Sequence, residues 1–193
     1  MLSGSLHSGN ASVGPGSHCR QVIDFITGID HRYEMKGLTV RCPFPFYDLV
    51  AMARVQIDLP ERFIFSTEIP LYISHINYGG HLDNALLLTV VSEARVRFFK
   101  FLGYSELDVE GISIIMADAA LQYRSEAFHG ETMVVEMTPA DFHGKGCDLV
   151  WRMSDKATGR EVARGKGGML FFDYNARKVQ PVPEGFLKRV GQA

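Results

Sequence analysis

The chain has 193 residues, which is enough for one ordinary domain with an extension but short for two domains. Apolar residues make up 46% and charged residues 22%, so the chain can form a large core, which excludes disorder of the whole protein. The formal net charge of −2 excludes the overall basic field of a dedicated nucleic-acid binder. An anionic ligand would therefore need a local group of basic residues.

The cysteines and the apolar runs indicate the compartment. Three widely spaced cysteines, Cys19, Cys42 and Cys147, indicate neither a disulfide framework nor a zinc site. No apolar run approaches the roughly 18 residues of a membrane-spanning helix, and residues 1–18 lack the features of a signal peptide. We expect a cytoplasmic protein that holds no metal and binds neither membrane nor nucleic acid.

The first quarter of the chain differs from the rest. Residues 1–18 are rich in Gly and Ser and predict a flexible linker, and residues 19–51 show no sustained hydrophobic period. The pattern becomes regular after Arg54. The sequence therefore predicts an extension over residues 1–51 and a domain over residues 52–193, and Met52 is a candidate start of the natural protein.

The regular region begins with a strand and a long helix. Residues 63–73 are rich in β-branched and aromatic residues and predict a strand, with Pro70 placing it at an edge or a bulge. Residues 82–102 predict a helix about 31 Å long that ends before Gly103. Apolar residues lie nearly all round this helix, which predicts that other elements enclose it.

The remaining segments supply that cover. Strands are predicted over residues 112–123, 132–142, 147–154 and 161–174, and short turns between them favour an antiparallel sheet. Gly165 and Gly167 share one face of the last strand and predict a close approach of a helix or a neighbouring backbone. With a short terminal helix over residues 184–190, the fold class is α+β in two layers.

The junction between the first strand and the long helix is the candidate site. Gly79 and Gly80 permit close backbone approach, and the first turn of a helix presents N–H groups that can stabilise an oxyanion. The expected backbone donors are Gly79, Gly80 and His81. Polar side chains surround them: His75, Asn77, His81 and Asn84. The alternative is a simple turn in which Asp83 or Asn84 caps the helix.

The segment from His75 to Ala85, with Ser92-Glu93-Ala94-Arg95 in the helix, resembles the hot-dog-fold thioesterase superfamily, in particular its 4-hydroxybenzoyl-CoA thioesterase and YbgC-like branch. The family pattern is Asp-x-Asp or Asp-x-Asn, then Gly-His-x-x-Asn, then Glu-x-x-Arg or Glu-Ala-Arg. The resemblance implies a hot-dog fold, an antiparallel sheet wrapped around one long helix. It also implies hydrolysis of an acyl-CoA thioester by a homodimer or tetramer, at the subunit interface, without a cofactor beyond the CoA of the substrate.

Three positions depart from the usual pattern. The resemblance places the catalytic acid at Asn77 and the first acid of the motif at His75, and Asn84 stands where YbgC-like enzymes have a histidine. An amide does not take up a proton near neutral pH. We therefore expect Asn77 to orient the water or the thioester carbonyl, and His81 or His75 to accept the proton.

Glu93 is a further candidate carboxylate. It lies about 18 Å beyond His81 along an ideal helix, so within one chain the two cannot act on the same atom. Its spacing from Arg97 gives an ordinary structural reason for its charge, although a partner subunit could bring it to a second site.

The phosphates of CoA require basic residues. The predicted cations, which could equally be solvated residues of the sheet, are Arg164, Lys166, Arg160, Arg152 and Lys145. The alternatives to a hydrolase are a non-catalytic acyl-CoA-binding module of the same fold, favoured by the missing acids, and a dehydratase or hydratase. The position of Glu93, far along the helix, disfavours the last.

Overall fold

The computed structural model describes residues 55–191. The predicted extension over residues 1–51, with its flexible linker at residues 1–18, Cys19, Cys42 and the candidate start at Met52 lie outside the described residues, and the boundary at residue 52 stays a prediction. Within the described residues, no helix is long and apolar enough to cross a membrane.

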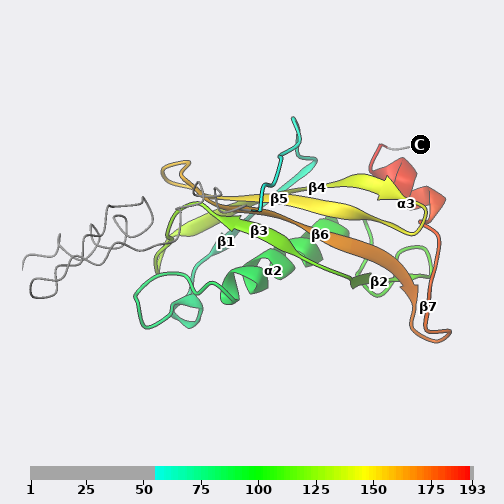
Figure 1. Cartoon of the computed structure of the whole chain (residues 1–193), viewed down its shortest axis with the longest axis horizontal. Coiled ribbons are helices and arrows are strands. Elements are labelled where there is room, and N and C mark those ends of the chain that lie inside the picture. The colour runs from blue at the N-terminus through cyan, green and yellow to red at the C-terminus, as the bar shows by residue number, and fades with distance from the viewer. Residues whose placement is uncertain (1–54, 192–193) are drawn as a thin grey trace, which may run out of the picture. The chain divides into compact units, whose positions relative to one another are not determined.

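One antiparallel sheet forms the larger layer (Figure 1). Its order is β1-β4-β5-β6-β2, and β3 and β7 also pair with β6. Short turns join β4 to β5 and β5 to β6, as the sequence predicts for an antiparallel arrangement. The strands are β1 (Phe65–Pro70), β2 (Ser113–Met116), β3 (Ala120–Tyr123), β4 (Thr132–His143), β5 (Gly146–Asp155), β6 (Glu161–Asp173) and β7 (Lys178–Val179).

Two predicted strands are shorter or broken in the structure. The first ends at Pro70, the last residue of an edge strand that pairs with β4 alone among the described strands, and a 3-10 helix η1 (Ile73–His75) follows. This confirms the edge position expected for Pro70, which has no N–H group for a second ladder. The strand predicted over residues 112–123 is divided into β2 and β3, because residues 117–119 leave the regular pairing with β6.

The long helix α2 (Leu86–Phe101) lies under the sheet in Figure 1. It begins at Leu86 rather than Leu82, and it ends just before Gly103, whose φ of 81° fits the predicted helix end. The short terminal helix α3 (Glu184–Arg189) is confirmed, and its buried Phe186 packs edge-on against Phe171 with ring centroids 5.2 Å apart.

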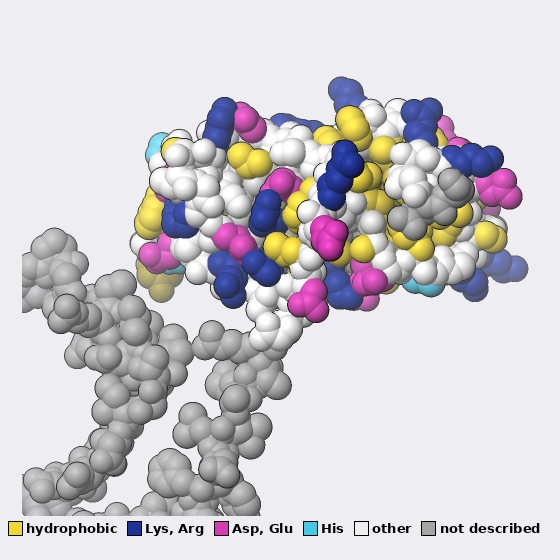
Figure 2. Space-filling view, turned by 90° about the horizontal axis from the view of Figure 1, so that it is seen from above, with side chains coloured by type: hydrophobic (Ala, Val, Ile, Leu, Met, Phe, Trp, Pro, Cys, Tyr) yellow, Lys and Arg dark blue, Asp and Glu magenta, His cyan; other side chains and the backbone are white. Residues whose placement is uncertain are grey.

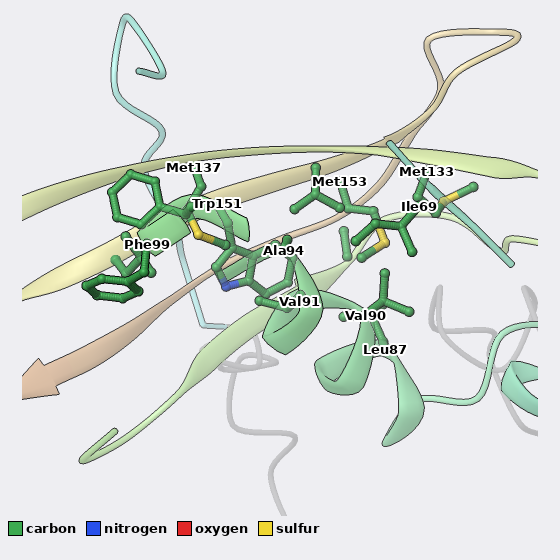
Figure 3. Close-up of a cluster of buried hydrophobic side chains, with 14 of the residues drawn as sticks. Ile69, Leu87, Val90, Val91, Ala94, Phe99, Met133, Met137, Trp151 and Met153 are labelled. Atoms are coloured by element: carbon green, nitrogen blue, oxygen red, sulfur yellow. The ribbon is translucent and has the colours of Figure 1, made fainter. Parts of the chain in front are cut away.

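The core lies between α2 and the inner face of the sheet (Figure 3). On α2 the buried residues are Leu87, Val90, Val91, Ala94, Phe98 and Phe99. The sheet contributes four buried methionines: Met133, Met137, Met153 and Met169. Within residues 55–191 the other side of α2 is less covered, since Leu88, Val96 and Phe101 are 37%, 48% and 60% exposed. The sheet thus curls around the helix as expected, but in this part of the chain it covers one side of the helix only.

The glycines of β6 do permit a close approach, although not by the helix. A Cβ atom on Gly165 would lie 2.7 Å from Cε2 of Trp151 and 2.7 Å from the carbonyl oxygen of Ala120. A Cβ atom on Gly167 would lie 2.6 Å from Cε of Met116. The indole of the buried Trp151 therefore occupies the space that a side chain on β6 would need.

Gly165→Ala is expected to lower the free energy of unfolding by about 1–3 kcal/mol, because the new methyl group overlaps Trp151 and the backbone of β3. Urea denaturation measures the change. The matched control is Gly144→Ala, where a Cβ atom meets nothing within 4 Å. Equal stability of the two variants would contradict this account of the β3–β6 contact.

Candidate active site

The glycine turn before α2 uses most of its own backbone donors. The Gly79 N–H donates to Oδ1 of Asn77 at 2.8 Å, and the Gly80 N–H donates to the Asn77 carbonyl at 3.0 Å. Gly80 has a φ of 85°, a conformation that glycine adopts without strain. Two of the three expected oxyanion donors are thus engaged in the turn. The third, the His81 N–H, has no acceptor among residues 55–191.

The first amides of α2 are also occupied. One carboxylate oxygen of Asp83 accepts hydrogen bonds from the N–H groups of Ala85 at 2.8 Å and Leu86 at 3.2 Å. The Leu87 N–H donates to the Asp83 carbonyl at 2.9 Å. Asp83 therefore caps the helix, as the structural alternative predicts. The expectation that the opening turn of the helix offers free N–H groups to a substrate carbonyl is wrong.

The side chains of Asn77 and His81 converge over Gly79. A Cβ atom on Gly79 would lie 3.0 Å from Oδ1 of Asn77 and 3.1 Å from Nε2 of His81. Nδ1 of His81 lies 3.2 Å from the Leu82 carbonyl oxygen, which can only accept a hydrogen bond. Nδ1 therefore carries the proton in the neutral ring, and Nε2 keeps its lone pair. The structure thus brings together the side-chain amide of Asn77 and a proton acceptor, Nε2 of His81.

His75 has a structural role, because its hydrogen bonds hold the chain in place. Its Nδ1 accepts a hydrogen bond from the Tyr72 N–H at 3.1 Å, and its carbonyl accepts one from the Asp83 N–H at 2.9 Å. Both contacts fix the path of the chain from η1 to α2. Of the two candidate histidine bases, His81 is the one that lines a cavity.

This first cavity has a volume of about 330 Å³ and lies between the turn before α2 and the loop after β3. The Leu82 N–H donates to the Ala127 carbonyl at 2.7 Å and joins the two segments. The lining residues are His81, Leu82, Asn84, Leu87, Tyr123, Arg124, Ser125, Glu126, Ala127 and Val162. Asn84 thus joins His81 at the cavity, whereas Asn77 and His75 do not line it.

Sequence reasoning missed the contribution of residues 123–126. They include a cation, Arg124, and a carboxylate, Glu126. No motif marks these residues, because only the pairing of Leu82 with Ala127, far apart in the chain, brings them to the candidate site.

A second cavity follows the first along α2. Leu87 lines the first cavity and Leu88 lines the second, which has a volume of about 310 Å³. Its walls are mainly apolar and include Trp151, Met116 and Met137, with polar groups from Asp118 and Lys166. The α2 residues Val91, Ser92 and Arg95 complete the helix side of this cavity.

Glu93 lines neither of these two cavities. Its carboxylate accepts a hydrogen bond from Nε of Arg97 at 2.7 Å. Arg97 also donates to Oγ1 of Thr67 at 3.2 Å and to the Glu68 carbonyl at 2.9 Å, both on β1. The ion pair therefore faces β1, and within one chain the structure does not bring Glu93 to His81.

Four of the five predicted CoA cations pair with carboxylates. The closest nitrogen–oxygen distances are 2.5 Å for Arg164–Glu161, Lys166–Asp148 and Arg152–Glu136, and 2.9 Å for Arg160–Glu131. The hydrogen bond from Arg164 lowers the pKa of Glu161, and the contact with Asp148 raises the pKa of Lys166. The fifth, Lys145, lies in the turn between β4 and β5. Their binding of CoA stays a prediction.

The pairs formed by Arg152 and Arg164 lie on the face of the sheet opposite α2. Arg164 donates to the Ile57 carbonyl at 3.4 Å, and the guanidinium carbon of Arg152 lies 5.4 Å from the ring centre of Phe63. The segment before β1 thus covers both. Figure 2 shows the face away from α2, where basic and acidic side chains are interspersed and form no continuous basic patch.

Residues 55–191 support neither a metal centre nor a cysteine nucleophile. They contain no group of three His, Cys, Asp or Glu side chains placed to hold a metal ion. Burial raises the pKa of the Cys147 thiol to about 12. Because the thiolate is the nucleophilic form, this cysteine is inert at neutral pH.

Comparisons with known proteins identify the family. The model of the thioesterase-like superfamily matches residues 72–190, and the chain belongs to this superfamily. No curated protein matches the sequence. Solved structures match over most of the described residues and show that the fold is the hot-dog fold.

Three of these structures are thioesterases or bind CoA. A 1,4-dihydroxy-2-naphthoyl-CoA thioesterase from Synechocystis has a TM-score of 0.61 and 15% identity, covering 66% of this chain and 95% of its own. A hypothetical protein from Staphylococcus aureus in complex with CoA has a TM-score of 0.59 and 16% identity, and the match covers 70% of this chain and 86% of that protein. A Thermus thermophilus thioesterase complexed with coenzyme A and Zn has a TM-score of 0.57 and 17% identity, covering 67% and 98%.

Proposed function

We propose that the protein hydrolyses an acyl-CoA thioester to a free acid and CoA. The observation that carries the proposal is His81, a residue of the cavity lining whose imidazole Nε2 has no hydrogen-bond partner among residues 55–191, in a chain of the thioesterase-like superfamily. CoA as the carrier is supported by the two structural relatives described as complexes with CoA.

The thioester carbonyl would accept hydrogen bonds from the His81 N–H and from the Asn77 side chain. Oδ1 of Asn77 is committed to the Gly79 N–H, so its NH₂ group is the end that can face a substrate. Donors at these positions stabilise the oxyanion that forms when water adds to the carbonyl. Asn84, which lines the first cavity together with His81, is a further donor for the water or the substrate.

His81 would transfer the protons. Nε2 takes one proton from the attacking water as the new C–O bond forms, and the resulting imidazolium returns it to sulfur as the C–S bond breaks. The products are a carboxylic acid and the free thiol of CoA. No covalent intermediate with the protein is needed.

The second cavity is the place for the acyl group. Its volume of about 310 Å³ is at the lower end of the range for small-molecule sites, and its walls are mainly apolar. Its position beside the first cavity, along the same side of α2, suits a chain that extends away from the thioester. This favours an apolar acyl group of modest size.

A second copy of the chain would complete the site, as the resemblance to hot-dog thioesterases implies. β2 and β3 pair only with β6 among the described strands, which leaves one edge of each unpaired. Ile115 and Tyr123 on these strands and Leu88 on α2 are exposed apolar residues. An unpaired edge with exposed apolar side chains favours pairing with another chain.

The activity is tested with purified protein and a panel of short, medium, long and aromatic acyl-CoAs. We expect turnover of at least one member, and His81→Ala should lower kcat by about 10²–10⁴-fold, the usual range for a general base. The matched control is His143→Ala, which changes a histidine at the end of β4 and should retain activity. Tight binding without turnover by the unaltered protein would instead establish the non-catalytic acyl-CoA-binding module.

Arg124 is proposed to contact a phosphate of CoA, because it borders the first cavity and its nearest carboxylate, Glu161, is 3.9 Å away. Arg124→Gln should raise the Kd for CoA by about 10-fold, the effect of losing roughly 1.4 kcal/mol. Calorimetric titration measures it. The exposed Arg62 provides the control, and an equal effect of Arg62→Gln would show that net charge, not position, is responsible.

The dimer is tested by sedimentation. The unaltered protein should sediment as a dimer or tetramer, and Ile115→Asp, which places a charge on the β2 edge, should shift it toward the monomer. Ile73→Asp, at an exposed position before α2, should not change the mass. A monomeric unaltered protein would contradict assembly through this edge.

A further inference from the structure

The lining of the first cavity includes a glutamate, the exposed Glu126, at a position that the family pattern does not mark. The pattern that resembles the thioesterases has its acids at positions 75 and 77, where this chain has His and Asn. Among the described residues that line the cavity, Glu126 is the only acidic one. Its carboxylate makes no hydrogen bond or ion pair with any residue in the range 55–191.

We propose that Glu126 is the catalytic carboxylate of this site, supplied by the loop after β3 in place of the acids missing before α2. This inference rests on the proposed hydrolysis. Asp83, the other carboxylate at the junction, is committed because it caps α2, and Glu93, farther along the helix, pairs with Arg97 toward β1.

The backbone on both sides of Glu126 is fixed. On one side, the Ser125 N–H donates to the Val162 carbonyl at 3.2 Å, and the Ser125 hydroxyl donates to the Glu161 carbonyl at 2.7 Å. On the other side, Ala127 is buried and its carbonyl accepts the hydrogen bond from Leu82. These bonds tie Glu126 to β6 and to the segment that carries His81, so its side chain starts from a determined point at the cavity wall.

Arg160 strengthens this arrangement without neutralising the Glu126 side chain. Its guanidinium donates to the Ser125 hydroxyl at 2.9 Å and to the main-chain carbonyl of Glu126. Both of these bonds come from Nη1, and Nη2 pairs with Glu131 at 2.9 Å. Arg160, one of the predicted CoA cations, is therefore a positioning residue for the loop. The Glu126 carboxylate stays available to accept a hydrogen bond.

In the reaction, Glu126 would hold the attacking water. The carboxylate accepts a hydrogen bond from one O–H of the water while Nε2 of His81 accepts the proton of the other. The water oxygen forms the bond to the thioester carbon, the C–S bond breaks, and the thiol leaves with the proton from His81. Glu126 remains ionised throughout, and its charge favours the imidazolium that forms beside it.

The test compares the unaltered protein with Glu126→Gln and Glu126→Ala on the best acyl-CoA of the panel. We expect kcat to fall about 10- to 100-fold in both variants, with KM changed less than about threefold, because the carboxylate acts on the water and not on the bound thioester. Glu184→Gln, an exposed glutamate at the start of α3, is the matched control and should keep full activity.

Chemical rescue separates catalysis from structure. Added formate should restore some of the kcat of Glu126→Ala, because a small carboxylate can enter the space left by the side chain, and it should not increase the kcat of the unaltered protein or of Glu184→Gln. Unchanged kcat in Glu126→Gln, with an active unaltered protein, would overturn the role of Glu126 alone. A loss of kcat that formate does not restore in Glu126→Ala would also overturn it. Absence of turnover by the unaltered protein would overturn both this inference and the proposed function.

Discussion

The burial of one side of α2 against the inner face of the sheet is the contact on which the rest of this structure depends. Ala94, Phe98 and Phe99 are completely buried there. Each large apolar side chain removed from water contributes about 1.5–3 kcal/mol. The contact fixes both the direction of α2 and the distance of its first turn from the sheet. The turn before the helix and the loop after β3 are consequently brought to the same place.

The site arises where those two segments meet. The N–H groups of Gly79 and Gly80 are hydrogen-bonded within the turn before α2. Those of Ala85 and Leu86 donate to the Asp83 side chain. Side-chain oxygens commonly satisfy the N–H groups of turns and helix N-termini in this way. Among residues 55–191 the N–H groups of His81 and Asn84 have no acceptor, and they are left for chemistry together with the His81 imidazole and the Asn77 side-chain amide. The loop after β3 adds the carboxylate and the cation that this turn lacks.

Much of the fold could be predicted from the sequence, because the signals are local. The alternation along residues 132–142, the glycine pair at 165 and 167 and the glycine after α2 each depend on neighbouring residues. The sequence pattern places the start of α2 too early because Leu82 continues the apolar series, while its amide bonds to Ala127 instead of joining the helix. The exposure of Val96 and Phe101 could not be predicted, since periodicity does not reveal how far a sheet curls.

The candidate site is only partly predictable for the same reason. His81 and Asn84 lie within one motif that marks them in the sequence, and the structure places both at the cavity. Arg124 and Glu126 follow a short strand with no motif of their own, and long-range pairing alone brings them there. The predicted cations on β5 and β6 share a strand face, but that face carries acidic partners as well.

A crystal structure of the full chain with a non-hydrolysable acyl-CoA analogue tests the central claim most directly. The account predicts that the carbonyl oxygen lies within hydrogen-bond distance, about 3 Å, of the His81 N–H, with the acyl group along α2 beside Trp151. An analogue bound instead on the opposite face of the sheet, over Arg152 and Arg164, or with its carbonyl away from His81, would contradict it.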